Sequence, residues 1–511
     1  MADNLNKKIV NATKWSTITE VMAKLVAPIS SMVLARLLTP EAFGVVATLH
    51  MVIAFAEIFT DAGFQRYLIQ HEFKDEEDKD KSTNVAFWSN LVMSFVLWGV
   101  IAIFREPLAT LVGSPGLGNV LVVACVSIPL AAFSSIQMAL FKRSFDFKTL
   151  FWRRMAVILV PLCVTIPLAF WLRSYWALVI GTIVTNVVNA LLLTLKSNWR
   201  PRRYYSFRRL KEMFSFCSWS IVDAVLVWAT SYVDIFFIGR ALNAYYLGVY
   251  KTSIATVGHF TTLITASVLP VVMPALSRLQ NNLPEMRKTL LKFQKYLSIL
   301  LLPLGVGIFM FRDLITEVML GSQWTEAAPF IGLWGLMSVI TIIFSRFCSP
   351  VYPAVGKPRV SVIVQLLHLV VLVPAVIISG QYGFRALYIT RSLVRLELVL
   401  VNLIFVYVMI KQSPWKMFTN ILPEVCSCLV MALVAFGLLK ISNAIVPSFV
   451  WIGICIMVYF AILYLFPKDR EIMLGIKDKA LSTVKKSKSK KRNEDSCSRG
   501  FCSPTSYCHP S

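Results

Sequence analysis

Two arginines lie in the apolar stretch 384–410, where their types and spacing suit them to bind an anion. Arg391 and Arg395 are four residues apart, so they share one face of a helix. They lie six and ten residues inward from Arg385 at the predicted outer edge, or about 9 and 15 Å along the axis. A diphosphate satisfies two neighbouring guanidinium groups through forked hydrogen bonds. Both are predicted substrate-binding residues; the alternatives pair them with buried acids or carbonyls, or turn Arg391 outward.

A third buried cation, Lys24, lies near the middle of the first apolar stretch. Glu20 lies one helical turn before it, in the order that favours an ion pair within the helix. Pro28, one turn later, removes a backbone hydrogen bond and would let this helix bend. Lys24 is predicted to bind an anionic substrate with the two arginines. An ion pair with Glu20 that only makes insertion easier is an equal alternative.

Acidic residues inside an apolar stretch can couple transport to an ion gradient. Asp223, Thr230 and Asp234 recur at spacings of seven and four, which places them on one stripe of a helix. A carboxylate that faces a cavity can bind Na⁺ or take up H⁺. Asp223 and Asp234 are therefore the predicted ion-coupling residues, and a salt bridge from Asp234 to Arg240 is the alternative. No cofactor beyond this ion is predicted.

Other polar side chains in apolar stretches support weaker predictions. Glu57 and Asp61 share a helix face near the end of one stretch, which favours an inner gate or a helix-end contact over transport chemistry. The single histidines His50, His259 and His368 are predicted to be packed side chains and not proton relays.

The composition requires a membrane to surround most of these residues. The chain of 511 residues has 57% hydrophobic and 15% charged residues, whereas soluble proteins carry about 25% charged residues. Its apolar stretches are about 20 residues long, enough to cross a bilayer as a helix. The polar leader 1–14 runs into a full-length span without a cleavage site, so no signal peptide is predicted. Fourteen spans are predicted, near 15–38, 43–64, 84–104, 119–141, 151–172, 176–195, 214–239, 247–276, 296–319, 327–350, 360–379, 384–410, 420–439 and 446–466.

Positive charge alternates between the predicted loops and sets the predicted orientation. Four of the 51 Lys and Arg residues lie inside spans, eight lie in outer loops, and the remaining 39 lie on the side of the termini. Because cytoplasmic loops carry the excess of Lys and Arg, both termini are predicted to be cytoplasmic. The net charge of +24 then reflects topology and not nucleic-acid binding, and the basic segment 196–211 is predicted to lie on anionic headgroups. The eight outer residues are Arg36, Arg105, Arg173, Arg240, Lys251, Arg312, Arg385 and Lys440.

The polar segments exclude several classes of protein. Before residue 467 no gap between spans reaches the roughly 50 residues that a folded domain needs, so no ATPase or soluble catalytic domain is predicted. The ten cysteines contain no CxxC pair and no zinc spacing, so no metal site is predicted. No catalytic residue is assigned. The segment 468–511 has the composition of a disordered basic tail.

A short repeat organises the chain into two halves. The segment Ala35–Val46, ARLLTPEAFGVV, returns 204 residues later as Gly239–Tyr250, GRALNAYYLGVY. Six spans separate the copies, and an even number of crossings preserves direction, which predicts parallel repeats. The predicted fold class is an all-α integral membrane protein with two six-helix lobes and two extra helices. The predicted parts are 1–211, 212–411, 412–467 for the extra helices and 468–511 for the tail.

Several motifs in order along the chain resemble one family. Three of them follow spans 1, 4 and 6: ARLLTPEAFG, FKRSFDFKTL and WRPRRYYSF. Two end spans 2 and 7, FTDAGFQRYLIQ and DIFFIGRALNAYYLGVY, and GSQWTEAAP precedes span 10. They resemble the Wzx-type flippases of the polysaccharide transport family, within the MOP superfamily that also contains the MATE exporters and the lipid II flippase. The likeness reaches to about residue 420 and is greatest to the colanic-acid and teichuronic-acid exporter branch.

The resemblance implies what such a protein would carry. It implies flipping of undecaprenyl-diphosphate-linked oligosaccharides across the bacterial cytoplasmic membrane for exopolysaccharide or lipopolysaccharide synthesis, with a polysaccharide polymerase and a chain-length regulator nearby. A MATE-like exporter of small molecules is the alternative. Its substrates are often cationic, whereas Lys24 and Arg395 favour an anion. A polymerase or ligase would need a large outer loop, and the outer loops here are short.

Overall fold

A computed structural model describes residues 2–61, 63–472 and 474. Inside its helices, the side chains of 2–14, 16–18, 21, 61, 216, 217, 219, 220, 223, 267, 269 and 270 lie outside the description. The described residues form helices and turns, with no strand among them. They belong to two compact units, Met1–Phe418 and Thr419–Ser511. Nearly all of the predicted tail 468–511 lies outside the described residues, and the predicted four-part division stays a prediction.

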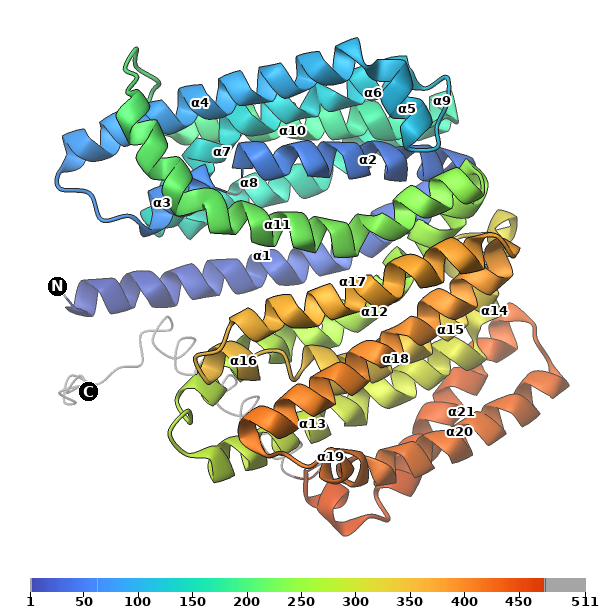
Figure 1. The fold of residues 1–511 in the computed structure, drawn as a ribbon. Coiled ribbons are helices and arrows are strands. Elements are labelled where there is room, and N and C mark those ends of the chain that lie inside the picture. Colours follow the sequence, from blue (N-terminus) through green and yellow to red (C-terminus); the bar gives the residue numbers. More distant parts are fainter. Residues whose placement is uncertain (1, 62, 473, 475–511) are drawn as a thin grey trace, which may run out of the picture. The chain divides into compact units, whose positions relative to one another are not determined.

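The first half of the large unit, here called the N-lobe, contains the helices from α1 to α10 (Figure 1). Local capping sets several of their starts: the Asp75 carboxylate accepts a hydrogen bond from the Asp78 N–H, and the Asp146 carboxylate accepts one from the Thr149 N–H. The helices are α1 (Ala2–Leu37), α2 (Pro40–Asp61), α3 (Phe64–Gln70), α4 (Glu76–Ile103), α5 (Arg105–Leu111), α6 (Gly118–Cys125), α7 (Ser127–Arg143), α8 (Phe147–Val160), the π-helical turn Pro161–Thr165, α9 (Ile166–Leu172) and α10 (Trp176–Lys196).

The second half, here called the C-lobe, repeats this plan. Asn243 and Asn282 cap two of its long helices through their side-chain oxygens. Its helices are α11 (Phe207–Ala241), α12 (Ala244–Ser277), α13 (Leu283–Met310), α14 (Arg312–Met319), the 3₁₀ turn Ser322–Trp324, α15 (Ala327–Thr341), the π-helical turn Ile342–Arg346, α16 (Val351–Ala354), α17 (Arg359–Gly380) and α18 (Gly383–Ile410), followed by α19 (Pro414–Asn420). In the second unit, α20 (Leu422–Ile441) packs against α21 (Ile445–Leu463).

The number of membrane spans comes close to the predicted fourteen without confirming it. Among the described residues, twelve helices are long and apolar enough to cross a membrane, or thirteen if α12, bent by 44° between Ala266 and Val271, is one span. The predicted first span falls in α1, which is not among them. The predicted span 296–319 extends too far: α13, which begins at Leu283, ends at Met310, and Arg312–Met319 form the separate helix α14.

The two copies of the repeat pack directly against each other where α2 and α12 begin. A Cβ added to Gly44 would lie 1.8 Å from the Ala244 carbonyl oxygen, and one added to Gly248 would lie 1.8 Å from the Pro40 carbonyl oxygen. Residues 40 and 244, like 44 and 248, are separated by the repeat offset, so the contact is reciprocal. Only glycine allows two backbones to approach this closely. The repeat therefore forms the interface between the two lobes.

Side chains of the C-lobe also cap the end of α1 beside this contact. The Trp324 indole N–H and the Gln323 amide each donate to the Ala35 carbonyl oxygen, at 2.8 and 2.7 Å. The Arg36 guanidinium donates in return to the Val318 carbonyl oxygen at 2.7 Å. These bonds use carbonyls that a helix end leaves unpaired. Figure 1 shows the α1–α2 and α11–α12 turns at one end of the two lobes. The hydrogen bonds at this end hold the lobes together.

Candidate functional site

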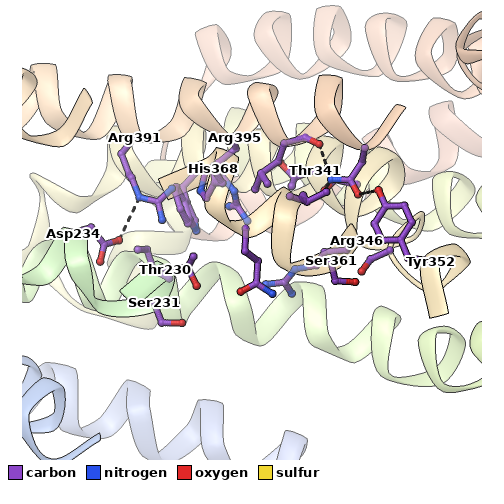
Figure 2. A pocket seen from close by; sticks show the side chains of 18 of the residues that line it. Thr230, Ser231, Asp234, Thr341, Arg346, Tyr352, Ser361, His368, Arg391 and Arg395 are labelled. Carbon is purple, nitrogen blue, oxygen red and sulfur yellow. Dashed lines mark hydrogen bonds and ion pairs between the residues drawn. The ribbon is translucent and has the colours of Figure 1, made fainter. Parts of the chain in front are cut away.

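A cavity of about 500 Å³ lies inside the C-lobe, lined by side chains of α11, α12, α15, α17 and α18 and by the π-helical turn before α16. Its charged lining consists of four cations and one carboxylate: Lys251, Arg346, Arg391, Arg395 and Asp234. Most of the other lining side chains carry hydroxyl or amide groups. Figure 2 shows Arg391 beside Asp234 at one end, with Arg346, Ser361 and Tyr352 at the other. The cavity therefore combines a surplus of positive charge with many neutral hydrogen-bonding groups.

Three helices meet in a buried cluster at one end of the cavity. The Arg391 Nε of α18 lies 3.2 Å from Asp234 Oδ2 of α11 and 3.1 Å from the Tyr250 hydroxyl of α12. The Tyr250 hydroxyl donates to the same carboxylate oxygen at 2.5 Å. Asp234 is 3% exposed and Arg391 8% exposed. The charge of Arg391 is therefore compensated inside the protein, which holds α11, α12 and α18 together.

Arg395 lies one helical turn further along α18 and has a different environment. Its Nη1 donates to the Ser338 hydroxyl at 2.6 Å, and its guanidinium lies 4.1 Å from the centre of the Trp334 ring. Trp334 also lies 5.3 Å from the Arg391 guanidinium. Within the described part of the chain, Arg395 has no carboxylate partner. Its positive charge and its remaining donors are thus available to an anion in the cavity.

Lys251 was misplaced by the sequence analysis, which put it in an outer loop. It lies inside α12, seven residues after the helix begins at Ala244, and lines the cavity. Its ammonium group lies 5.4 Å from the centre of the Tyr232 ring and, among the described residues, forms no ion pair. Its position inside the predicted span 247–276 was the signal that could have identified it. Arg346, on the π-helical turn, is exposed and lines the same cavity.

Of the other predicted site residues, Asp234 is brought to these arginines by a described contact, whereas Lys24 is not. Lys24 lies 3.7 Å from Glu20 in α1 and does not line the cavity. Asp223 belongs to α11, but its side chain lies outside the described residues. Asp234 pairs with Arg391, 157 positions away, and in the described structure not with Arg240. The roles predicted for these residues stay predictions.

His368 and Glu397 form a further polar pair that the sequence analysis did not single out as a site. His368 Nδ1 of α17 lies 2.8 Å from Glu397 Oε2 of α18, and His368 lines the cavity. His368 is buried, as predicted for a packed histidine, but the sequence analysis did not predict Glu397 as its partner. Glu397 follows Arg395 by two residues, but no spacing in the sequence connects it to a histidine 29 positions earlier.

The N-lobe has a smaller polar cavity of about 120 Å³. It is lined by Glu57, Thr60, Gln65 and Asn189, by two serines and by apolar side chains, and no Lys or Arg is in its described lining. Two cations outside the lining donate to its side chains: Arg153 to the Asn189 oxygen at 2.9 Å, and Lys142 to the Gln65 oxygen at 3.3 Å. The two described cavities therefore differ in size and in the sign of the charged side chains that line them.

Membrane-spanning helices packed in two lobes, with a polar cavity inside one of them, are the architecture of a membrane transport protein. The model of one family, described as polysaccharide biosynthesis protein, matches residues 33–329. The chain belongs to this family. The predicted resemblance is confirmed.

Individual relatives are similar over most of the chain. One is the succinoglycan biosynthesis transport protein ExoT of Rhizobium meliloti (strain 1021), 25% identical over 362 residues, or 70% of this chain and 72% of that protein. Another is the lipopolysaccharide biosynthesis protein WzxC of Escherichia coli (strain K12), 19% identical over 412 residues, or 80% and 82%. The teichuronic acid biosynthesis protein TuaB of Bacillus subtilis (strain 168) is 21% identical over 344 residues, or 67% and 70%.

Solved structures support the two-lobed fold. The inward closed conformation of the lipid II flippase MurJ matches with a TM-score of 0.71 at 17% identity, covering 89% of this chain and 98% of that one. An inward-facing MATE family multidrug transporter of the MOP superfamily matches with a TM-score of 0.60 at 14% identity, covering 78% and 98%. The predicted fold class is confirmed by these similarities, apart from the number of spans.

Proposed function

We propose that this protein flips an oligosaccharide linked through a diphosphate to a polyprenyl lipid, such as undecaprenyl, across the bacterial cytoplasmic membrane. The observation that carries the proposal is the C-lobe cavity, which offers four cations against one carboxylate. A diphosphate diester carries two negative charges, and guanidinium groups bind phosphate through several aligned donors. The hydroxyl and amide groups of the lining suit the sugars. The relatives named for polysaccharide and flippase functions support the same substrate class.

The four cations of the cavity have different proposed roles. Arg391 is neutralised by Asp234 and therefore acts mainly to position α18, whereas Arg395 and Lys251 keep charge for the diphosphate. Arg346, exposed at the other end, would attract the headgroup as it enters. Lys24 remains a candidate contact from the N-lobe. The glycan would occupy the polar cavity and the polyprenyl chain would stay in the lipid.

The proposed direction is from the inner to the outer leaflet, with both termini cytoplasmic. The distribution of Lys and Arg supports this orientation, and it places the Gly44–Gly248 contact on the outer side. Alternating access then requires the two lobes to separate at that contact. Coupling to Na⁺ or H⁺ through Asp223 or Asp234, and contacts with a polymerase and a chain-length regulator in exopolysaccharide or lipopolysaccharide synthesis, belong to the same proposal.

A MATE-like exporter is the second candidate, favoured by the similarity of fold to the inward-facing transporter. Cationic drugs would require a cavity with a surplus of acid groups. The C-lobe cavity has the opposite charge, and the N-lobe cavity, which holds Glu57, measures only about 120 Å³. An anionic substrate in the C-lobe is therefore the better supported proposal.

The proposal is tested by flipping in proteoliposomes. A fluorescent polyprenyl-diphosphate oligosaccharide is incorporated, and its appearance in the opposite leaflet is followed for wild type, Arg395→Gln and Arg208→Gln. Arg208 is a matched control because it lies at the exposed start of α11, next to Glu212. Losing a charge-assisted hydrogen bond of about 1.5–3 kcal/mol predicts about 10- to 150-fold weaker binding for Arg395→Gln, with slower flipping at low substrate.

Each result of this experiment has a distinct meaning. Wild-type flipping that Arg395→Gln impairs and Arg208→Gln preserves supports both the substrate and the site. Normal flipping by Arg395→Gln would reject the site and keep the substrate. A wild type that moves no such lipid, while a soluble cation drains from the same vesicles, would replace the proposal with the exporter.

A further inference from the structure

His368 and Glu397 bring two titratable groups together at the wall of the C-lobe cavity. Their ring nitrogen and carboxylate oxygen are 2.8 Å apart, and their side chains are 8% and 19% exposed. The second carboxylate oxygen, Glu397 Oε1, is buried without a hydrogen-bond partner in the described structure. Burying a carboxylate oxygen without a hydrogen-bond donor costs free energy. The stability of the ionised carboxylate therefore depends strongly on the hydrogen bond to its other oxygen. The His368 ring is that neighbour.

The charged groups around this pair come from every element packed on it. Arg391 and Arg395 lie on α18 with Glu397, Asp234 on α11, Lys251 on α12 and Arg346 on the π-helical turn. The phenol of Tyr352, on α16, also lines the cavity and donates to the Asn402 side-chain oxygen at 2.5 Å. Four cations face two carboxylates, so the cavity carries a net charge of +2 when His368 is neutral and +3 when it is protonated.

We propose that the His368–Glu397 pair is a proton-binding site that takes up one proton when the anion enters the cavity. The inference rests on the proposed anion site and adds its regulation. In the empty cavity the four cations oppose a further positive charge on the imidazole. A dianionic headgroup cancels much of this field, and Glu397, within hydrogen-bonding distance, stabilises the imidazolium as an ion pair.

The coupling works in both directions because binding free energies are reciprocal. If the anion raises the affinity of the pair for a proton, the proton raises the affinity for the anion by the same factor. No bond other than that to the proton forms or breaks, and the proton comes from the water in the cavity. The pair therefore adjusts the charge of the site to its cargo.

Two variants fix the pair in opposite states. Glu397→Gln keeps a polar group of the same shape but removes the negative charge. Without the ion pair the imidazole stays neutral over the tested pH range, and the cavity then carries the charge of the protonated pair. His368→Asn keeps a donor near the position of Nδ1 but cannot become a cation, so Glu397 stays ionised and the cavity carries the lower charge. A merely structural pair would be weakened in the same direction by both changes.

The test measures the affinity of detergent-solubilised protein for a polyprenyl-diphosphate monosaccharide between about pH 5 and 8, where histidine titrates. This diester keeps two charges throughout that range. Wild-type affinity should rise as the pH falls, by up to about tenfold per pH unit for one linked proton. Glu397→Gln should bind tightly and His368→Asn weakly, both without this slope. The exposed carboxylate of Glu285 at the start of α13 provides the matched control, Glu285→Gln, which should keep the wild-type slope.

A second measurement needs no variant. Adding the same lipid to wild type in weak buffer should remove up to one proton per bound lipid from solution. Binding without proton uptake, slopes unchanged in both variants, or affinity shifts of the same sign in the two variants would each overturn the inference. Absence of binding at every pH would instead overturn the anion site itself, and the inference with it.

Discussion

The two lobes share a repeat but differ in what their cavities can bind. At the repeat offset, Asp234 of the C-lobe corresponds to Ser30 in α1, whose hydroxyl donates to the Val26 carbonyl oxygen of its own helix. Lys251 corresponds to Ala47, which packs in the core. The described C-lobe cavity thus measures about 500 Å³ with surplus positive charge, and the described N-lobe cavity about 120 Å³ with no cation in its described lining. Symmetry determines the scaffold, whereas a few different residues in one copy create the proposed binding site.

The largest expected difference between the lobes concerns stability. Arg391→Ala leaves the buried Asp234 carboxylate without its cation, which is expected to cost about 3–5 kcal/mol. Arg153→Ala in the N-lobe removes a hydrogen bond to the neutral Asn189 and should cost about 1 kcal/mol. Thermal unfolding of the purified proteins in detergent compares them. The double variant Asp234→Asn with Arg391→Gln should recover part of the loss, and equal losses for the two single variants would contradict the asymmetry.

The glycine contact should instead reveal symmetry. Gly44→Ala and Gly248→Ala each place a methyl group against a carbonyl oxygen of the other lobe, and such overpacking costs about 1–3 kcal/mol. Because the contact is reciprocal, the two losses in unfolding midpoint should be similar. Gly258→Ala on α12 is the control, since no atom lies within 4 Å of its added Cβ. If only one of the two contact glycines is sensitive, the lobes do not meet as equivalents.

Anion affinity should again separate the lobes. Lys251→Gln removes a cavity cation that has no ion-pair partner in the described structure, so binding of the polyprenyl-diphosphate lipid should weaken about five- to tenfold while the unfolding midpoint changes little. Glu57→Gln alters the one charged residue in the described lining of the N-lobe cavity and should leave this affinity unchanged. A stronger effect of Glu57→Gln than of Lys251→Gln would indicate that the anion binds in the N-lobe and contradict the proposed site.

The smallest expected effect concerns the ring between the two arginines. Trp334→Phe keeps an aromatic face but weakens its attraction for the Arg395 and Arg391 guanidinium groups, which lie 4.1 and 5.3 Å from the ring centre. A loss of about 0.5–1 kcal/mol predicts about two- to fivefold weaker lipid binding in the same titration. Trp334→Leu should weaken it further. Equal affinities for the three proteins would show that the ring does not position the arginines.

Much of the fold could be predicted because it depends on signals local in sequence. Apolar length identifies the helices, and the repeated motif at Gly44 and Gly248 identifies the two halves. Two predictions were in error. The predicted span 296–319 extends past the end of α13 at Met310, and Lys251 was assigned to an outer loop although it lies inside α12. Hydropathy is averaged over a window and does not reveal a break within a long apolar stretch, whereas Lys251 could have been assigned correctly from its place in the predicted span 247–276.

The candidate site was only partly predictable. The spacing of Arg391 and Arg395 correctly places them on one helix and, in the structure, both line one cavity. Nothing in the sequence connects Arg391 with Asp234 or His368 with Glu397, because these partners lie on different helices. The difference between a compensated and an available arginine therefore could not be predicted.

The sequence by itself determined that this is a two-lobed helical membrane protein with cations where lipid would exclude them. Hydrophobic length, charge distribution and the repeat are properties of neighbouring residues, so they can be recognised without coordinates. Only the tertiary structure decided which cations share one cavity, that Asp234 neutralises Arg391 and that Glu397 lies against His368. Electrostatic interactions depend on distance in space, and helix packing alone sets these distances.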